Sequence, residues 1–177
     1  GRYDMSMFDN LAWGWQGLEV DASDVFLQGG EVYIAKAEPE RDELYFSDFE
    51  SKTMIGIQGY HYNFASFNAD ESFLRTRFNM QLTKSNLGSI KMLLQGGRGD
   101  IAVVSKSFLA KYLKENPLDR SKLLISRKMD QGYQHSIILR RGISLTIDEV
   151  NRILAELRAS GKLGSLWESI DPASIYQ

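Results

Sequence analysis

The most informative absence in this sequence is that of cysteine. None of its 177 residues is a cysteine, which excludes thiol catalysis, cysteine-ligated zinc, iron–sulfur clusters and a disulfide-stapled fold. Only 3 residues are proline, so the collagenous and proline-rich disordered classes are excluded as well. No stretch approaches the roughly 20 apolar residues that span a bilayer. What remains is the composition of an ordinary globular protein.

A surplus of basic charge is also missing. The chain has 21 Lys and Arg residues against 23 Asp and Glu residues, which gives a net charge of −2. Such a balance supplies no basic surface for a phosphate backbone. We therefore expect no nucleic acid among the partners.

The sequence lacks the common catalytic and metal-binding motifs. His61 and His135 lie 74 positions apart, so they cannot form a metal pair on one helix. There is no Gly-x-Ser-x-Gly elbow. The cluster Gly96–Gly99 fits neither the dinucleotide-binding pattern nor the phosphate loop, and is typical of a tight turn. We predict no catalytic residue, no metal and no cofactor.

Strand and helix patterns alternate along the chain after an irregular, aromatic first thirty residues that we leave unassigned. Helices are predicted at 64–74, at 86–95 behind Ser85 or Asn86, at 105–116, and from 146 behind the capping box of Thr146 and Glu149. Strands are predicted at 31–36, 54–58, 78–82, 101–104, 123–125 and 136–139. This order indicates an α/β fold with a mixed sheet and helices on both of its faces.

The triplet of Tyr60, His61 and Tyr62 directly follows a predicted strand that ends at Gly59. In α/β sheets, ligands gather beyond the carboxyl ends of the strands. The triplet is therefore a candidate ligand loop, with a surface turn of packed aromatic side chains as the alternative.

From Gly30 to Ile170 the chain resembles the type II periplasmic solute-binding proteins of the polar amino acid ABC-transporter family, which is extracellular solute-binding protein family 3. The specific part is Ser89–Val104, which looks like the family's helix, Gly-Arg-x-Asp turn and following strand. Met54–Gly59 is similar to its entry to the second lobe, Ser136–Gly142 to its return strand, and Val150–Trp167 to its closing helices.

The resemblance implies a periplasmic-binding-protein-like type II fold of two lobes, with hinge closure around a ligand. Residues 1–30 would be a remnant of the first lobe, 31–36 and 135–140 the hinge strands, 37–134 the complete second lobe, and 141–177 the closing helices on the first lobe. Most of the first lobe would then be missing, so we expect a fragment that can associate with itself through the incomplete lobe.

Three departures from the family pattern concern the ligand. Ser105 stands where amino-acid binders carry the Asp that pairs with the ligand's ammonium group. The stretch 13–16 lacks the Arg that holds the ligand's carboxylate, and Tyr60 replaces a small hydroxyl residue. A standard α-amino acid is therefore doubtful as the ligand.

The resemblance implies non-catalytic binding of a small polar organic solute in the periplasm, for delivery to an inner-membrane ABC transporter permease. The candidate ligand-binding residues are Tyr60, His61, Tyr62, Ser85, Asn86, Ser105, Tyr133, Gln134, Trp13 and Trp15. Ordinary capping is the alternative role for Ser85 and Asn86. Two further functions stay open on this fold: a ligand-sensing module of a signalling or regulatory protein, and a dehydratase- or lyase-type enzyme, which would need a convergent acid/base pair.

Overall fold

The computed structural model describes residues 3–170, with side chains described as far as residue 166. Residues 171–177 of the predicted closing segment lie outside the described residues, as do the side chains of Trp167 and Ile170. The chain divides into two compact units. Unit 1 comprises residues 1–29 and 133–177, and unit 2 comprises residues 30–132. The lobe and hinge assignment stays a prediction.

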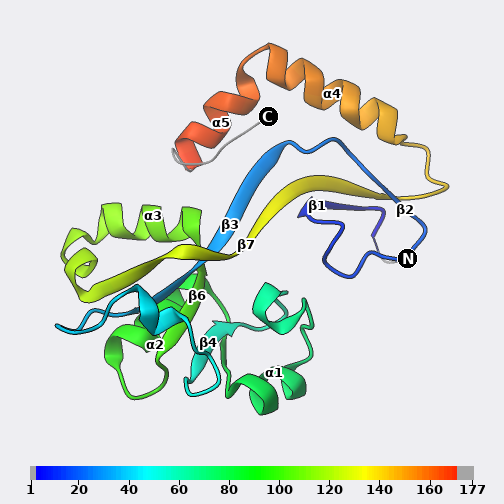
Figure 1. The fold of residues 1–177 in the computed structure, drawn as a ribbon. Coiled ribbons are helices and arrows are strands. Elements are labelled where there is room, and N and C mark those ends of the chain that lie inside the picture. The colour runs from blue at the N-terminus through cyan, green and yellow to red at the C-terminus, as the bar shows by residue number, and fades with distance from the viewer. Residues whose placement is uncertain (1–2, 171–177) are drawn as a thin grey trace. The chain divides into compact units, whose positions relative to one another are not determined.

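Unit 2 is built on the sheet order β7-β3-β6-β4-β5. Figure 1 labels β7, β3, β6 and β4. Its strands are β3 (Leu27–Lys36), β4 (Met54–Ile57), β5 (Gln81–Thr83), β6 (Ile101–Ser105) and β7 (Leu123–Arg140). β4 runs parallel to both β5 and β6, whereas β3 runs antiparallel to β6. The sheet is therefore mixed, as the sequence predicts.

Side chains on β3 and β6 alternate between two hydrophobic cores, because successive residues of a strand point to opposite faces. Val32 and Ile34 enter a core with α2 (Asn86–Gln95) and α3 (Lys106–Glu115). Tyr33 and Ala35 enter a second core on the other face. That core includes buried residues of η2 (Asn63–Ala65) and α1 (Glu71–Phe78), and Phe46 of η1 (Glu43–Phe46). A further 3-10 segment, η3 (Pro117–Lys122), precedes β7.

Unit 1 contains two short strands, β1 (Met5–Asp9) and β2 (Val20–Ala22), which both pair antiparallel with the C-terminal part of β7. The helices α4 (Ile147–Ala159) and α5 (Lys162–Ile170) follow, drawn in orange and red in Figure 1. Their apolar residues form a third core with Phe26, which precedes β3, and with the C-terminal part of β7. Its buried members are Phe26, Ile137, Leu139, Val150, Leu154 and Leu163. No helix among the described residues has the length and apolarity that crossing a bilayer requires.

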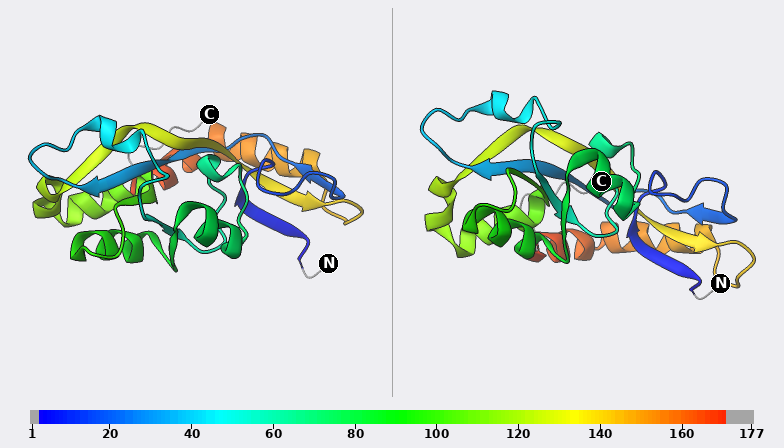
Figure 2. Two further views of the ribbon diagram at one scale, coloured as in Figure 1. Left: turned by 60° about the horizontal axis from the view of Figure 1, so that its bottom comes forward. Right: turned by 90° about the horizontal axis from the view of Figure 1, so that it is seen from below.

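Two features of the chain link the units covalently. β3 begins in unit 1 and enters unit 2 at Gly30, and β7 leaves unit 2 after Gly132. Within unit 2 these strands are neighbours in the sheet and run side by side in both views of Figure 2. The two strands predicted at 123–125 and 136–139 are thus one continuous strand.

The predicted helix over 64–74 is wrong. Ser66 and Phe67 both have positive φ angles, which end the short η2 segment. α1 begins only at Glu71, where Asp70 accepts a hydrogen bond of 2.7 Å from the Phe73 amide. Because α1 then continues through Phe78, the strand predicted at 78–82 is shortened to β5.

Candidate ligand-binding site

Three parallel strands bring polar residues to one edge of the unit 2 sheet. β4, β5 and β6 end at Ile57, Thr83 and Ser105, and each is followed by a turn or a helix start. Tyr60 and His61 follow β4, Ser85 and Asn86 follow β5, and Ser105 closes β6. The structure therefore brings five of the predicted residues to the edge where α/β sheets bind ligands.

The starts of α2 and α3 are held together by an asparagine side chain. Asn86 Oδ1 accepts a hydrogen bond of 3.0 Å from the Ser105 amide, and Asn86 Nδ2 donates to Ser105 Oγ over 3.3 Å. Ser85 caps α2, with its Oγ accepting from the Gly88 amide at 3.1 Å. Two helix N-termini, which carry free N–H groups, thus lie beside each other.

The aromatic turn after β4 divides between core and surface. Tyr62 is 0% exposed, its hydroxyl accepts a 2.6 Å bond from the Ile57 amide, and its ring stacks on Phe64. These contacts give Tyr62 a packing role. Tyr60 is 39% exposed and His61 is half-buried. These two residues keep the ligand-loop prediction open.

Two buried carboxylates lie close to this edge and were missed as site candidates. Glu31, on β3, and Asp130, on β7, are each 3% exposed. Glu31 stands directly opposite Ser105 in the antiparallel pairing of β3 and β6. Gln131 Nε2 donates to Glu31 Oε2 at 2.9 Å and also to the His61 carbonyl at 2.5 Å. A charged residue directly before the apolar run 32–35 is the sequence signal that could have found Glu31.

Burial controls the protonation of both carboxyl groups. Desolvation, reinforced by the charge of Asp130, raises the pKa of Glu31 to about 7, against a lowering by its bond from Gln131. Desolvation also raises the pKa of Asp130. Burial, and then the charge of Glu31, raise the pKa of Tyr60.

Among the described residues, Glu31 and Asp130 have different hydrogen-bond partners, although the charge of Asp130 acts on Glu31. Asp130 accepts from the Tyr33 hydroxyl at 2.6 Å and from the amides of Asn63 and Phe64 at 2.9 and 3.1 Å. Both of its oxygens are therefore engaged in holding the η2 segment to β7. This arrangement gives Asp130 a structural role.

The remaining predicted residues lie in unit 1. Trp13, Tyr133 and His135 form an aromatic cluster, with ring centroids 4.6 to 5.8 Å apart. Trp15 Nε1 donates to Asp9 at 2.7 Å, and Gln134 is exposed. The structure thus joins Trp13 to Tyr133 but gives Trp15 a separate partner.

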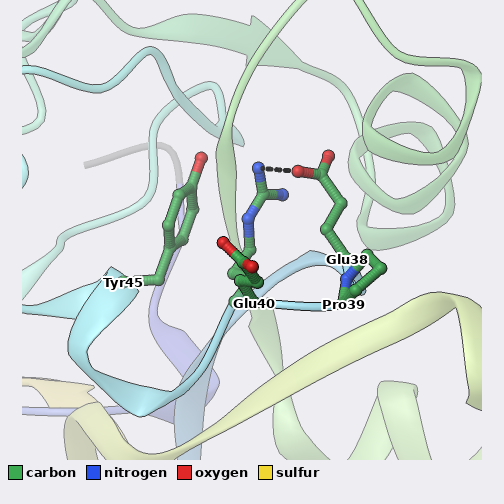
Figure 3. Close-up of a pocket in the computed structure, with 5 residues that line it drawn as sticks. Glu38, Pro39, Glu40 and Tyr45 are labelled. Carbon is green, nitrogen blue, oxygen red and sulfur yellow. Dashed lines mark hydrogen bonds and ion pairs between the residues drawn. The ribbon is translucent and has the colours of Figure 1, made fainter.

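A surface pocket of about 500 Å³ lies in the loop after β3. It is lined by Glu38, Pro39, Glu40, Arg41 and Tyr45. Tyr45 forms one side and Glu38 with Pro39 the other (Figure 3). Arg41 is already engaged by Glu38 at 2.8 Å, by the Lys36 carbonyl at 2.9 Å and by the Tyr45 ring at 4.0 Å. The pocket contains none of the predicted ligand residues.

No group of three or more His, Asp or Glu side chains among the described residues is placed to hold a metal ion. The polar edge instead combines hydroxyl, amide, phenol and imidazole groups with one buried carboxylate. Such a set can donate and accept hydrogen bonds to a small organic molecule.

The chain matches no protein-family model, and no curated protein matches it. Solved structures do match. A mutant of ArgBP from T. maritima has a TM-score of 0.68 at 20% identity, over 96% of this chain and 69% of that one. The arginine-, lysine-, histidine-binding protein ArtJ from Geobacillus stearothermophilus has a TM-score of 0.68 at 18% identity, over 96% and 70%.

A third match is a histidine kinase sensor domain with similarity to periplasmic binding proteins. Its TM-score is 0.70 at 16% identity, over 100% of this chain and 73% of that one. At sequence identities this low, the structural similarity establishes the fold alone. The chain has the periplasmic-binding-protein-like fold, with a mixed sheet and helices on both of its faces.

Proposed function

We propose that this chain binds a small polar organic solute without chemically changing it, at the carboxyl edge of β4, β5 and β6. The main support for the proposal is the pair of hydrogen bonds between Asn86 and Ser105, which hold the starts of α2 and α3 side by side at that edge. Tyr60 and His61 supply further polar groups from the neighbouring turn.

The solved structures support the same kind of function. Both ArgBP and ArtJ are named as amino-acid-binding proteins, and another match is the substrate-binding protein of an amino acid ABC transporter. By this analogy, the chain would act in the periplasm and pass its solute to an ABC transporter permease in the inner membrane.

Native mass spectrometry and thermal shift with a panel of polar organic solutes test the binding proposal. Asn86→Ala should weaken the binding of any solute found by at least about tenfold, since it separates the two helix starts and removes a hydrogen-bonding amide. Asn116→Ala is the matched control, because Asn116 donates to Tyr112 at the opposite end of α3. Absence of any bound solute, or equal binding by both variants, would contradict the proposal.

A sensory function is the second candidate. The histidine kinase sensor domain matches over the whole of this chain. Deleting the gene separates the two functions. Under the transport proposal, uptake of the radiolabelled solute falls. Under the sensor alternative, uptake continues and a solute-dependent change in transcription is lost.

A further inference from the structure

Glu31 is a buried carboxylate with a single hydrogen-bond donor. It is 3% exposed, and among the described residues its only donor is the amide of Gln131. No ion pair within the described part of the chain includes it, although nine pairs form elsewhere. Burying an ionisable group with so few partners disfavours its charged form. Ionised Glu31 therefore lowers the stability of the fold.

Asp130 shows what a structural carboxylate looks like in the same unit. It is as buried as Glu31 but receives three hydrogen bonds, from Tyr33, Asn63 and Phe64. The hydrogen bonds that Asp130 accepts thus hold the η2 segment against β7. No comparable set of donors accounts for the carboxylate of Glu31.

The groups around Glu31 favour a cation. On β6, Ser105 is its direct cross-strand neighbour, and cross-strand neighbours point to the same face. On β7, the side-chain nitrogen of Gln131 donates hydrogen bonds to both Glu31 and the His61 carbonyl. Asp130, also on β7, adds a second negative charge. The turn after β4 contributes the phenols of Tyr60 and Tyr62. Among the described residues, the groups that act on Glu31 include no lysine or arginine.

We infer that Glu31 selects a cationic group, an ammonium or a guanidinium, in the solute that this chain binds. The inference rests on the proposed function and adds the class of ligand. The solute's cation supplies the charge partner that the protein does not provide, and a charge-assisted hydrogen bond forms on binding. Because that bond requires the carboxylate form, binding releases a proton wherever Glu31 is protonated beforehand.

The test compares cationic probes with their neutral isosteres on the intact chain by calorimetry. The pairs are arginine with citrulline, butylguanidinium with butylurea, and choline with its neutral carbon isostere. We expect the wild type to bind a cationic member at least about tenfold more tightly than its neutral partner, and Glu31→Gln to abolish that preference while keeping the neutral affinity. Glu115→Gln, which removes an exposed charge at the end of α3, should keep the preference.

Each other outcome has a definite meaning. Failure of every probe to bind the wild type overturns the proposed function and this inference with it. Equal binding of both members of a pair, or an unchanged preference in Glu31→Gln, overturns the inference alone. Binding of Ca²⁺ or Mg²⁺ that Glu31→Gln abolishes would replace an organic cation by a metal and also overturn it.

A direct readout follows the carboxyl carbon of Glu31 by NMR. Its titration midpoint should move downward when a bound probe is cationic and stay in place when the bound probe is neutral. A midpoint that ignores a bound cationic probe would show that Glu31 does not contact the cation.

Discussion

At the scale of single residues, Glu31 and Asp130 show how equal burial can support different roles. The number of donors separates them, one for Glu31 and three for Asp130. Loss of the Asp130 carboxylate would leave three donors without their acceptor, whereas the poorly solvated Glu31 carboxylate destabilises the fold when it is ionised. Removing the Asp130 side chain should therefore destabilise the protein, whereas neutralising Glu31 should stabilise it.

Glu31→Gln should stabilise the protein above neutral pH. Because the pKa of Glu31 is raised from 4.5 to about 7 in the folded state, the folded chain holds more protons than the unfolded chain between these values. Stability is therefore lost as the pH rises from about 4.5 to about 7. The variant should remove this loss and gain roughly 3 kcal/mol at pH 8. Urea unfolding across that range checks it, and a gain that does not depend on pH would contradict it.

Asp130→Ala should destabilise the protein by about 3 kcal/mol, because it leaves the Tyr33 hydroxyl and two backbone amides without their acceptor. Asp48→Ala is a control, since the Asp48 side chain bonds only exposed groups of its own loop. Urea unfolding at neutral pH measures both. A loss below about 1 kcal/mol for Asp130→Ala would mean that other groups replace the acceptor.

At the scale of elements, the sequence predicts the structures that local interactions stabilise, such as helix caps. The capping box of Thr146 and Glu149 forms as the sequence indicates, and Ser85 caps α2. β1 and β2 escaped prediction because their partner, the end of β7, follows more than a hundred residues later. β7 itself was split in two because Asp130 and Gln131 interrupt its apolar pattern with buried hydrogen-bonding groups.

The same division applies to the candidate site. The predicted strand ends and helix starts agree with the positions of Ser85, Asn86 and Ser105 in the fold, since position along the chain determines them. The sequence predicts Glu31 only as part of a strand and not as a site residue, because its buried environment depends on Gln131, which lies 100 residues away. The sequence predicts Tyr62 as part of a ligand loop with Tyr60 and His61, whereas its hydroxyl turns inward and accepts a hydrogen bond from the Ile57 amide.

Thr146→Ala should destabilise α4 by about 1 kcal/mol, because the Thr146 hydroxyl accepts from the Glu149 amide and completes the cap. Thr146→Ser keeps that hydroxyl and should retain most of the stability. Thermal unfolding of the three proteins provides the comparison. Equal losses in both variants would assign the effect to the methyl group instead of the cap.

At the scale of the whole molecule, each of the three hydrophobic cores lies within a single unit. Two cores lie entirely within residues 30–132, and the third lies in unit 1. Residues 30–132 also form an uninterrupted segment, whereas unit 1 combines two distant segments. Unit 2 therefore has what an independent domain needs.

Residues 30–132 expressed alone should fold cooperatively. Its two cores are complete without unit 1, so we expect native-like circular dichroism and a single urea transition. The chemical shifts of Asn86 and Ser105 amides should match those in the full chain. A chain that stays unfolded alone would show that unit 1 is needed to stabilise unit 2.

The full chain should associate with itself through the region around β1. This strand pairs with β7 and ends the sheet order, and exposed apolar side chains gather on and after it, namely Met5, Met7, Phe8, Leu11 and Leu18. An open, apolar edge favours contact with another chain. In analytical ultracentrifugation, Met5→Lys with Met7→Lys should reduce association. Leu118→Lys, at an isolated exposed leucine of unit 2, should leave association unchanged.

The discontinuity of unit 1 sets an order of events during protein synthesis. Unit 2 has all of its residues once Gly132 has left the ribosome. β1 and β2, although translated before unit 2, must wait for residues 136–140 of β7 before they can pair. The apolar residues on and after β1 thus stay without their sheet while unit 2 is made, and this part of the nascent chain has the greatest need of chaperones.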